Sequence, residues 1–263
     1  MKTRALLTPQ DRFLLGAVGA GGCAVLVEGV SLTGLVDPGM LPRFSTVVVK
    51  GAELAVDPDF LGHVGATWAA CGIGLFIAVC AAVPAGLLLG SVPGLERALR
   101  PLLEFLRPIP PLSLAPLATF LWAENQDAKI ALIVFACSWP LLINTLYGLM
   151  EVDPLAKETL RSFGFGPLRI LYHVSLPSTA PFIATGLRIA VSVSLAVAVS
   201  VELVVGGVDG IGTFIAQEGS ANIRDGMLAG ALWAGALGLA ANMVCDAVGR
   251  HLFQWHRSRT ERT

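Results

Sequence analysis

Long apolar stretches, each able to cross a lipid bilayer as a helix, constrain this sequence more than any other feature. About 20 helical residues cross the hydrocarbon core. The stretches of about this length lie at about 13–36, 64–90, 102–122, 129–150, 179–205 and 227–249. With 54% hydrophobic and 14% charged residues, the chain is too apolar for an ordinary soluble domain. We therefore expect an all-α membrane protein, with a single transmembrane domain over residues 1–263 and six transmembrane helices.

The distribution of lysine and arginine predicts the orientation of these helices. If the N-terminus is inside, 13 of them fall on cytoplasmic segments: Lys2, Arg4, Arg12, Arg97, Arg100, Arg107, Lys157, Arg161, Arg169, Arg250, Arg257, Arg259 and Arg262. The outer segments hold only Arg43, Lys50, Lys129 and Arg224. Cytoplasmic loops carry the excess of basic residues in membrane proteins. We therefore expect both termini and the segment 151–178 in the cytoplasm, and the protein in the plasma (inner) membrane of a bacterium.

The first apolar stretch has an alternative interpretation as a cleaved signal peptide. It follows a basic flank, as a signal peptide core does, but it is longer than a typical core and more spans follow it. A membrane span is therefore the favoured interpretation.

Charge and cysteine usage argue against several kinds of site. The net charge is −1 and the chain has no long basic run, so nucleic acid is not an expected partner. None of the five cysteines has the C-x-x-C spacing of a redox or zinc site. All five lie in apolar runs, where a thiol behaves as a small hydrophobe. We expect no disulfide, no metal site and no cofactor.

The third apolar stretch is rich in proline. A helix cannot keep its hydrogen bonds across so many prolines, and broken backbone at membrane depth is tolerated only where protein or a water-filled cavity covers it. The stretch therefore borders a pathway through the bundle, or it is a kinked packing helix. The candidate pathway residues here are Pro108, Pro110, Pro111, Ser113, Pro116 and Thr119.

Three acidic residues lie inside the apolar stretches, where an ionisable group is a functional candidate by default. Glu28 and Asp246 lie close to the ends of their stretches and can reach the membrane interface. Glu202 lies late in the fifth stretch, before the glycine-rich turn 206–212. We therefore consider both a structural role near the outer rim and a gate or pathway role for Glu202.

The polar segment 151–178 separates the fourth and fifth stretches. Asp153 before Pro154 is typical of an N-cap followed by proline in the first turn, so a helix is predicted from there to Ser162. Gly164 and Gly166 should break it. A second short helix is predicted from Leu168 to His173, ending before Leu176-Pro177 because proline disfavours a preceding helix.

This segment resembles the EAA loop of ATP-binding-cassette (ABC) importer permeases. The family pattern has E-A-A, three residues, glycine, nine residues and I-x-L-P. Here Glu158 is followed by Gly164 at the same spacing and then by Val174-Ser175-Leu176-Pro177. Thr159 and Leu160 replace the two alanines, and Val174 replaces the isoleucine. Residues 107–122, 143–154 and 186–203 are similar to the nitrate, sulfonate and taurine branch, and the resemblance covers roughly residues 40–255.

The resemblance implies a type I ABC importer permease that forms the path of a small solute such as nitrate, a sulfonate or taurine. No G-x-x-x-x-G-K-[ST] motif occurs in the chain, so two partner ATPase subunits would hydrolyse ATP and the chain itself would not be an enzyme. An outer solute-binding protein would deliver the solute, and a second copy or a related permease would complete the pathway. The implied coupling residues are Glu158, Gly164, Phe165, Gly166, Pro167, Leu168, Arg169, Leu171 and Pro177.

Other functions stay open from the sequence. A vitamin precursor, such as a thiamine pyrimidine or a riboflavin-type solute, also fits a permease of this branch. A self-contained transporter or channel would use the segment 151–178 as a simple connector. A membrane enzyme would need catalytic or metal-binding residues clustered at one depth, and the sequence gives no sign of such a cluster.

Overall fold

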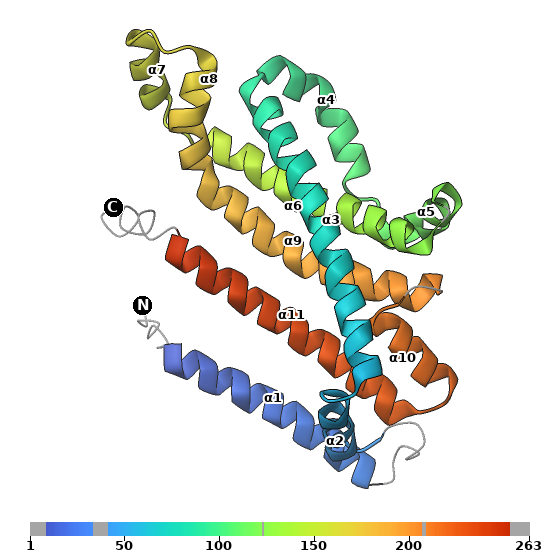
Figure 1. Cartoon of the computed structure of the whole chain (residues 1–263). Coiled ribbons are helices and arrows are strands. Elements are labelled where there is room, and N and C mark those ends of the chain that lie inside the picture. The colour runs from blue at the N-terminus through green and yellow to red at the C-terminus, as the bar shows by residue number, and fades with distance from the viewer. Residues whose placement is uncertain (1–8, 34–41, 123, 207–208, 253–263) are drawn as a thin grey trace. The chain divides into compact units, whose positions relative to one another are not determined.

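The computed structural model describes residues 9–33, 42–122, 124–206 and 209–252, and every regular element within these ranges is helical (Figure 1). Lys2, Arg4, Arg257, Arg259 and Arg262, and the end of the predicted first span, lie outside the described residues. The helices are α1 (Pro9–Leu32), α2 (Phe44–Leu54), α3 (Pro58–Ser91), α4 (Pro93–Leu106), the 3₁₀ helix η1 (Pro111–Leu114), α5 (Ala115–Leu121), α6 (Asn125–Met150), α7 (Pro154–Ser162), α8 (Pro167–Ile170), the π-helix η2 (Leu171–Ser175), α9 (Leu176–Val205), α10 (Ile211–Ser220) and α11 (Arg224–Leu252).

Four of the helical stretches are long and apolar enough to cross a membrane: 58–91, 125–150, 167–205 and 224–249. They contain the predicted second, fourth, fifth and sixth spans, and most of the predicted first span lies in α1. In hydrocarbon a helix satisfies all its backbone groups internally, which favours this form for each apolar stretch.

The chain divides into two compact units, which are described separately. Unit 1 comprises residues 1–61 and 214–233, and unit 2 comprises residues 62–213 and 234–263. In unit 1 the Glu28 carboxylate accepts hydrogen bonds from Ser45 N at 3.1 Å and Ser45 Oγ at 2.9 Å, which ties α1 to α2. Trp233 Nε1 donates to the Gly51 carbonyl at 2.8 Å, and Phe60 packs edge-on against Trp233.

The core of unit 2 is built from α3, α6 and α9. Figure 1 shows α9 running alongside α6, and these two helices pack extensively on each other. Their close approach depends on small residues, as is usual between membrane helices. A Cβ added to Gly186 would lie 2.9 Å from the Pro140 carbonyl oxygen and 3.3 Å from Leu141 Cα. Both of these atoms belong to the backbone, so neither can move away by a rotamer change.

The predicted third span is not one continuous helix. It begins within α4, which ends at Leu106, and it continues through η1 and the seven residues of α5. Pro110 is extended, with φ −64° and ψ 127°, and its carbonyl accepts a hydrogen bond from Ser113 Oγ at 2.7 Å. The helix is thus interrupted where the prolines cluster, because proline supplies no N–H donor and its ring collides with the preceding turn.

The prediction that the second loop helix ends before Leu176-Pro177 is wrong. The chain continues from α8 through η2 into α9 without leaving the helical conformation. In η2 the Leu176 N–H donates to the Leu171 carbonyl, five residues back, instead of the usual four. This wider π-turn lies just before Pro177, and a proline in the first turn of α9 needs no N–H donor.

Substitution of Gly186 tests the packing of α6 on α9. We expect Gly186→Ala to destabilise the protein by about 1–3 kcal/mol, because the new methyl group overpacks against backbone. Gly72→Ala on α3 is the matched control, since nothing lies within 4 Å of its added Cβ and alanine favours a helix. Thermal unfolding of both variants in detergent measures the difference. Equal unfolding temperatures would contradict the proposed close contact.

Candidate functional site

The segment between α6 and α9 begins with a capped helix. Asp153 precedes α7, and its carboxylate accepts a hydrogen bond from the Leu155 N–H at 2.9 Å, which confirms the predicted N-cap. At the C-terminal end of α7, the Gly164 N–H donates to the Arg161 carbonyl at 2.9 Å, and the Phe165 N–H donates to the Leu160 carbonyl at 3.0 Å. Short loops of this kind close a helix end by satisfying its last carbonyl groups.

Gly164 is the turn residue between α7 and α8. Its φ is +79°, in the left-handed region where a side chain costs roughly 1–2 kcal/mol. This backbone conformation favours glycine at the position. Nothing lies within 4 Å of a Cβ added there, so the constraint is the backbone conformation alone.

The segment 151–178 exposes large apolar side chains. Leu155, Phe163, Leu168 and Tyr172 are 68%, 75%, 80% and 69% exposed. A concentration of exposed large apolar side chains in one short segment favours a protein contact site. We call these four residues the apolar loop surface.

The residues named for coupling lie on or next to this surface. Glu158, Gly164, Gly166, Pro167, Leu168, Arg169 and Pro177 are exposed, whereas Phe165 and Leu171 are half-buried. The Phe165 ring packs edge-on against His173, at 6.2 Å between centroids. Within the described residues, Glu158 makes no ion pair with Arg161, which lies three residues further along α7.

The proline-rich stretch packs through one face on α6 and α9. Ala115 and Ala118 are buried with Ala128, Leu132 and Val201 in a small apolar cluster. Pro116 and Ser113 are exposed, and Thr119 Oγ1 donates to backbone carbonyls of its own helix. The stretch therefore has both a packed face and an exposed face.

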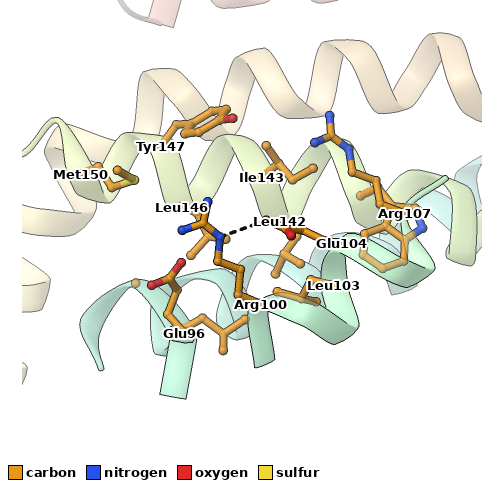
Figure 2. Close-up of a pocket in the computed structure, with 13 residues that line it drawn as sticks. Glu96, Arg100, Leu103, Glu104, Arg107, Leu142, Ile143, Leu146, Tyr147 and Met150 are labelled. Carbon is orange, nitrogen blue, oxygen red and sulfur yellow. Dashed lines mark hydrogen bonds and ion pairs between the residues drawn. The ribbon is translucent and has the colours of Figure 1, made fainter. Parts of the chain in front are cut away.

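A cavity of about 430 Å³ lies between α4 and the neighbouring parts of α3 and α6 (Figure 2). Its charged lining comes from Glu96, Arg100, Glu104 and Arg107, and its apolar lining includes Trp139 and Leu146. Arg100 Nε donates to Glu104 Oε1 at 2.9 Å. Figure 2 shows Glu96 and Arg107 at opposite ends of this row of charges. The sequence placed Arg107 on a cytoplasmic segment and did not indicate this cavity.

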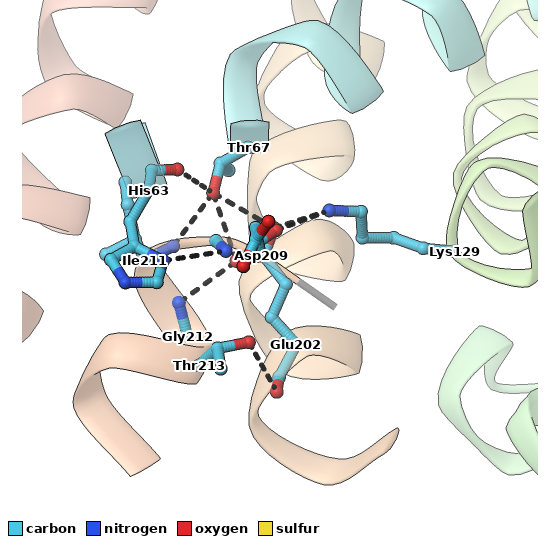
Figure 3. Close-up of polar contacts among 9 residues, drawn as sticks. His63, Thr67, Lys129, Glu202, Asp209, Ile211, Gly212 and Thr213 are labelled. Carbon is cyan, nitrogen blue, oxygen red and sulfur yellow. Dashed lines mark hydrogen bonds and ion pairs between the residues drawn. The ribbon is translucent and has the colours of Figure 1, made fainter. Parts of the chain in front are cut away.

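Glu202 is fully buried and forms the centre of a polar cluster (Figure 3). Lys129 Nζ lies 3.1 Å from Glu202 Oε1, and both side chains are 0% exposed. Thr67 Oγ1 lies within hydrogen-bond distance of both carboxylate oxygens, at 2.9 and 3.1 Å, and the Gly212 N–H donates to Oε2 at 3.0 Å. The cluster joins α3, α6, α9 and the start of α10.

The glycine-rich turn before α10 fits closely around this carboxylate. A Cβ on Gly210 would overlap the Glu202 carboxyl group, and one on Gly212 would overlap the Val199 carbonyl oxygen. The Ile211 N–H donates to Thr67 Oγ1 at 2.9 Å, and Lys129 Nζ donates to the Asp209 carbonyl at 3.0 Å. Of the two roles considered for Glu202, this geometry favours the structural one.

The sequence alone did not indicate the partners of Glu202. It placed Lys129 among the outer loop residues and gave Thr67 no role. The two charges could have been paired from the topology, because the start of the fourth span and the end of the fifth span meet the same membrane face. A second pair, Arg188 with Asp246, joins α9 to α11 in unit 2.

Substitutions of the buried pair test whether it holds the helices together. Lys129→Met or Glu202→Gln alone should cost about 3–5 kcal/mol, because each leaves an uncompensated buried group. The double variant should be more stable than either single one, since no charge is then left unpaired. Thermal unfolding in detergent measures all three.

The exposed pair Lys50 and Glu53 in unit 1 provides the control. Its atoms are 3.1 Å apart, and this hydrogen bond raises the pKa of Lys50. Lys50→Met should cost less than about 1 kcal/mol, because water screens an exposed pair. Single variants of the buried pair that unfold no earlier than Lys50→Met would rule out its structural role.

Comparison with known families decides the assignment. Residues 82–258, which include the loop, the cavity and the buried pair Lys129 and Glu202 but not Thr67, match the family described as the binding-protein-dependent transport system inner membrane component. The chain belongs to this family. Membership agrees with the resemblance inferred from Glu158, Gly164 and Pro177.

Several curated relatives are permeases of this family. The chain is 32% identical to the bicarbonate transport permease CmpB of Synechocystis sp., over 63% of this chain and 59% of that protein. It is 29% identical to the nitrate import permease NrtB of Leptolyngbya laminosa, over 74% and 73% of the two chains. It is also 29% identical to the taurine transport permease TauC of Escherichia coli, over 84% and 82%. The match spans only about 60% of the bicarbonate permeases.

Solved transporters share the fold. A chain of the MetNI methionine ABC transporter, in inward-facing conformations, matches with a TM-score of 0.63 and 19% identity, over 74% of this chain and 98% of that chain. A chain of a bacterial ABC transporter involved in import of the polysaccharide alginate matches with a TM-score of 0.66 and 14% identity, over 91% and 99%. The all-helical architecture is therefore that of ABC importer membrane subunits.

Proposed function

We propose that this chain is the transmembrane permease subunit of an ABC importer. The observation that carries the proposal is the structure of the segment 151–178. This segment contains both the left-handed Gly164 and the apolar loop surface, and it lies within the residues that match the family. An apolar patch that projects into water needs a partner, and an ATPase subunit is the partner such a permease requires. ATP hydrolysis then belongs to two ATPase subunits, and the chain supplies the path for the solute.

The proposed topology has six crossings with both termini in the cytoplasm. The crossings are α1, α3, the broken unit of α4 with η1 and α5, then α6, α9 and α11. Helices α2 and α10 lie at the outer side, and α7 and α8 at the inner side. The excess of basic residues on the inner segments supports this orientation.

The coupling element in this proposal is the turn from Phe165 to Leu171, held by Gly164 and followed by Pro177. The short helix α8 docks on the ATPase, with exposed Leu168 and Arg169 as contacts. Because α8 continues directly into α9, movement of the ATPase reaches a membrane helix without an intervening flexible joint.

The partners follow from the same architecture. A second permease copy completes the pathway as a homodimer, with a related permease as the alternative. An extracytoplasmic solute-binding protein delivers the solute, and one structural neighbour was solved with an alginate-bound periplasmic protein. The solute is a small one such as nitrate, a sulfonate or taurine, as the names of the relatives suggest. A vitamin precursor is the alternative solute.

Gly164→Asp tests the coupling role. The variant should insert normally but lose ATPase binding, because the strained turn misdirects α8 and adds a charge to the contact. A cost of about 1–2 kcal/mol changes the docked population by about 5- to 30-fold. Uptake and solute-stimulated ATP hydrolysis should fall together. Co-purification of the ATPase with the chain measures whether ATPase binding is lost.

Gly166→Ala is the matched control in the same loop. Gly166 has φ −71° and ψ 163°, which any residue adopts, and nothing lies within 4 Å of its added Cβ. It should keep its ATPase and its uptake. If Gly164→Asp behaves like this control, the loop is not the coupling element.

Cysteine labelling tests the topology. In a background without the five native cysteines, Ser45→Cys on α2 and Ser162→Cys on α7 should react from opposite sides of the membrane. Both positions are exposed in the chain. A membrane-impermeant maleimide applied to intact cells should label position 45 and not position 162. Labelling of both positions from one side would reject the six-crossing arrangement.

A further inference from the structure

The ion pair between Arg188 and Asp246 has an exposed side. The two side chains come from α9 and α11 in unit 2, and 50% and 33% of their surfaces are exposed. Within the described residues, the Arg188 guanidinium group contacts Asp246 through Nη1 alone. A guanidinium group has five N–H donors, so most of the donors of Arg188 find no acceptor in this part of the chain.

Arg188 lies inside the hydrocarbon core if α9 is a membrane crossing. It is 12 residues from the start of α9 at Leu176 and 17 residues from the end at Val205, which is about 18 and 25 Å at 1.5 Å per residue. The 30 residues of α9 are about 45 Å long and exceed a core of roughly 30 Å by about 15 Å. Both distances are larger than this excess, so Arg188 is inside the core however the helix is centred. Asp246 is at the same depth because it contacts Arg188.

Neither lipid nor α6 can cover the exposed side of this pair. Hydrocarbon provides no hydrogen-bond partner, and charged side chains at membrane depth face protein or a water-filled cavity. Helix α6 packs on α9 through Gly186 and Ala190. Each of these lies two residues from Arg188, and two residues turn a helix by about 200°, so α6 contacts the opposite side of α9. The exposed side therefore needs water or a second protein surface.

The neighbouring residues on this side of α9 favour a protein surface over water. Thr185, Ser192, Ala196 and Ser200 follow one another along it and are exposed or half-buried. Two of the hydroxyl groups donate back to carbonyls of α9 itself, from Thr185 to Pro181 at 3.0 Å and from Ser200 to Ala196 at 2.8 Å. The side chains are thus small and their donors are already used, as close packing between membrane helices requires.

We propose that the exposed side of the Arg188 and Asp246 pair is part of the contact between two copies of this chain. Two copies inserted in the same orientation are related by a two-fold axis along the membrane normal, which keeps every residue at its own depth. Arg188 of one copy then meets Asp246 of the other copy, and the two pairs form a ring of four charges with alternating sign. The surface is self-complementary because it carries both charges at one depth.

This contact rests on the proposed permease function, in which a second copy completes the pathway, and it specifies the surface that the copy covers. Each charge gains a second partner of opposite sign, which uses the remaining donors of Arg188. Charges removed from water are tolerated when further hydrogen bonds satisfy them in this way. A related permease could replace the second copy only if it presented the same two charges at the same depth.

Charge exchange between two chains tests the contact. Two full-length chains with different affinity tags are co-expressed, and recovery of the second tag with the first in detergent measures their association. Arg188→Asp in both chains should lower this recovery at least about tenfold, because acids then face acids. Asp246→Arg in both chains should do the same with basic groups. Arg188→Asp in one chain and Asp246→Arg in the other should restore recovery, because opposite charges then meet only across the contact.

Two further variants separate this result from a folding defect. Exchange of both charges within one chain, Arg188→Asp with Asp246→Arg, keeps an ion pair in every chain and should associate like the unchanged protein. Lys50→Glu, in the exposed pair of unit 1, should leave association unaltered. Normal association of the single variants would refute the contact. Single variants that lose association and do not regain it on co-expression would also refute it, because the pair then acts within one chain.

Crosslinking tests the contact with both charges in place. Ala196 and Leu239 are exposed, eight residues after Arg188 and seven before Asp246. They lie about 12 and 10 Å from the charges, toward the outer side in the proposed topology. In a background without the five native cysteines, one tagged chain carries Ala196→Cys and the other Leu239→Cys, and copper phenanthroline should join them in membranes. Val244→Cys replaces Leu239→Cys as the control and should not crosslink, since it is exposed on another side of α11.

The assembled transporter separates this contact from the permease function. Copies that associate through these charges but bind no ATPase would reject the permease function alone. An ATPase-bound, active transporter whose copies associate equally well with every charge variant would reject the contact alone. Labelling of Ala196→Cys by a membrane-impermeant thiol reagent, without any crosslink, would reveal a water-filled passage at this side of α9 and would likewise reject the contact.

Discussion

Hydrocarbon offers no hydrogen-bond partner, so every polar group at membrane depth has to be satisfied by the protein or by water in a cavity. Glu202 meets this demand most completely, since Thr67, Lys129 and Gly212 surround its carboxylate. Four helices thereby meet at one buried charge, and Gly210 is required because a side chain would occupy the carboxylate's place.

Much of the fold could be predicted because the signals are local. The long apolar stretches alone indicate membrane helices, and the cluster of prolines indicates that the third stretch is broken. In the loop, Asp153 beside Pro154 predicts the start of α7, and the spacing of Glu158 and Gly164 predicts the turn that follows. Each of these depends on residues within one continuous stretch of the chain, so a single sequence contains the necessary information.

The remaining features depend on contacts between distant residues. The pairing of Lys129 with Glu202 joins positions 73 residues apart, and hydropathy assigns each of them only to the end of a span. The continuity of α8 with α9 was missed because the π-turn at Leu171–Ser175 accommodates Pro177, whereas local rules treat such a proline as a helix end.

The uninterrupted helix from Pro167 to Val205 has a mechanical consequence. Its 39 residues span about 58 Å, so the short helix α8 and the buried end at Glu202 belong to one stiff rod. A tilt of about 5° around one end of a rod of this length displaces the other end by about 5 Å, roughly one helical turn. Small rotations at the Pro167 end are therefore amplified at the Val205 end, and the tightly bound carboxylate lies close to where the displacement is largest.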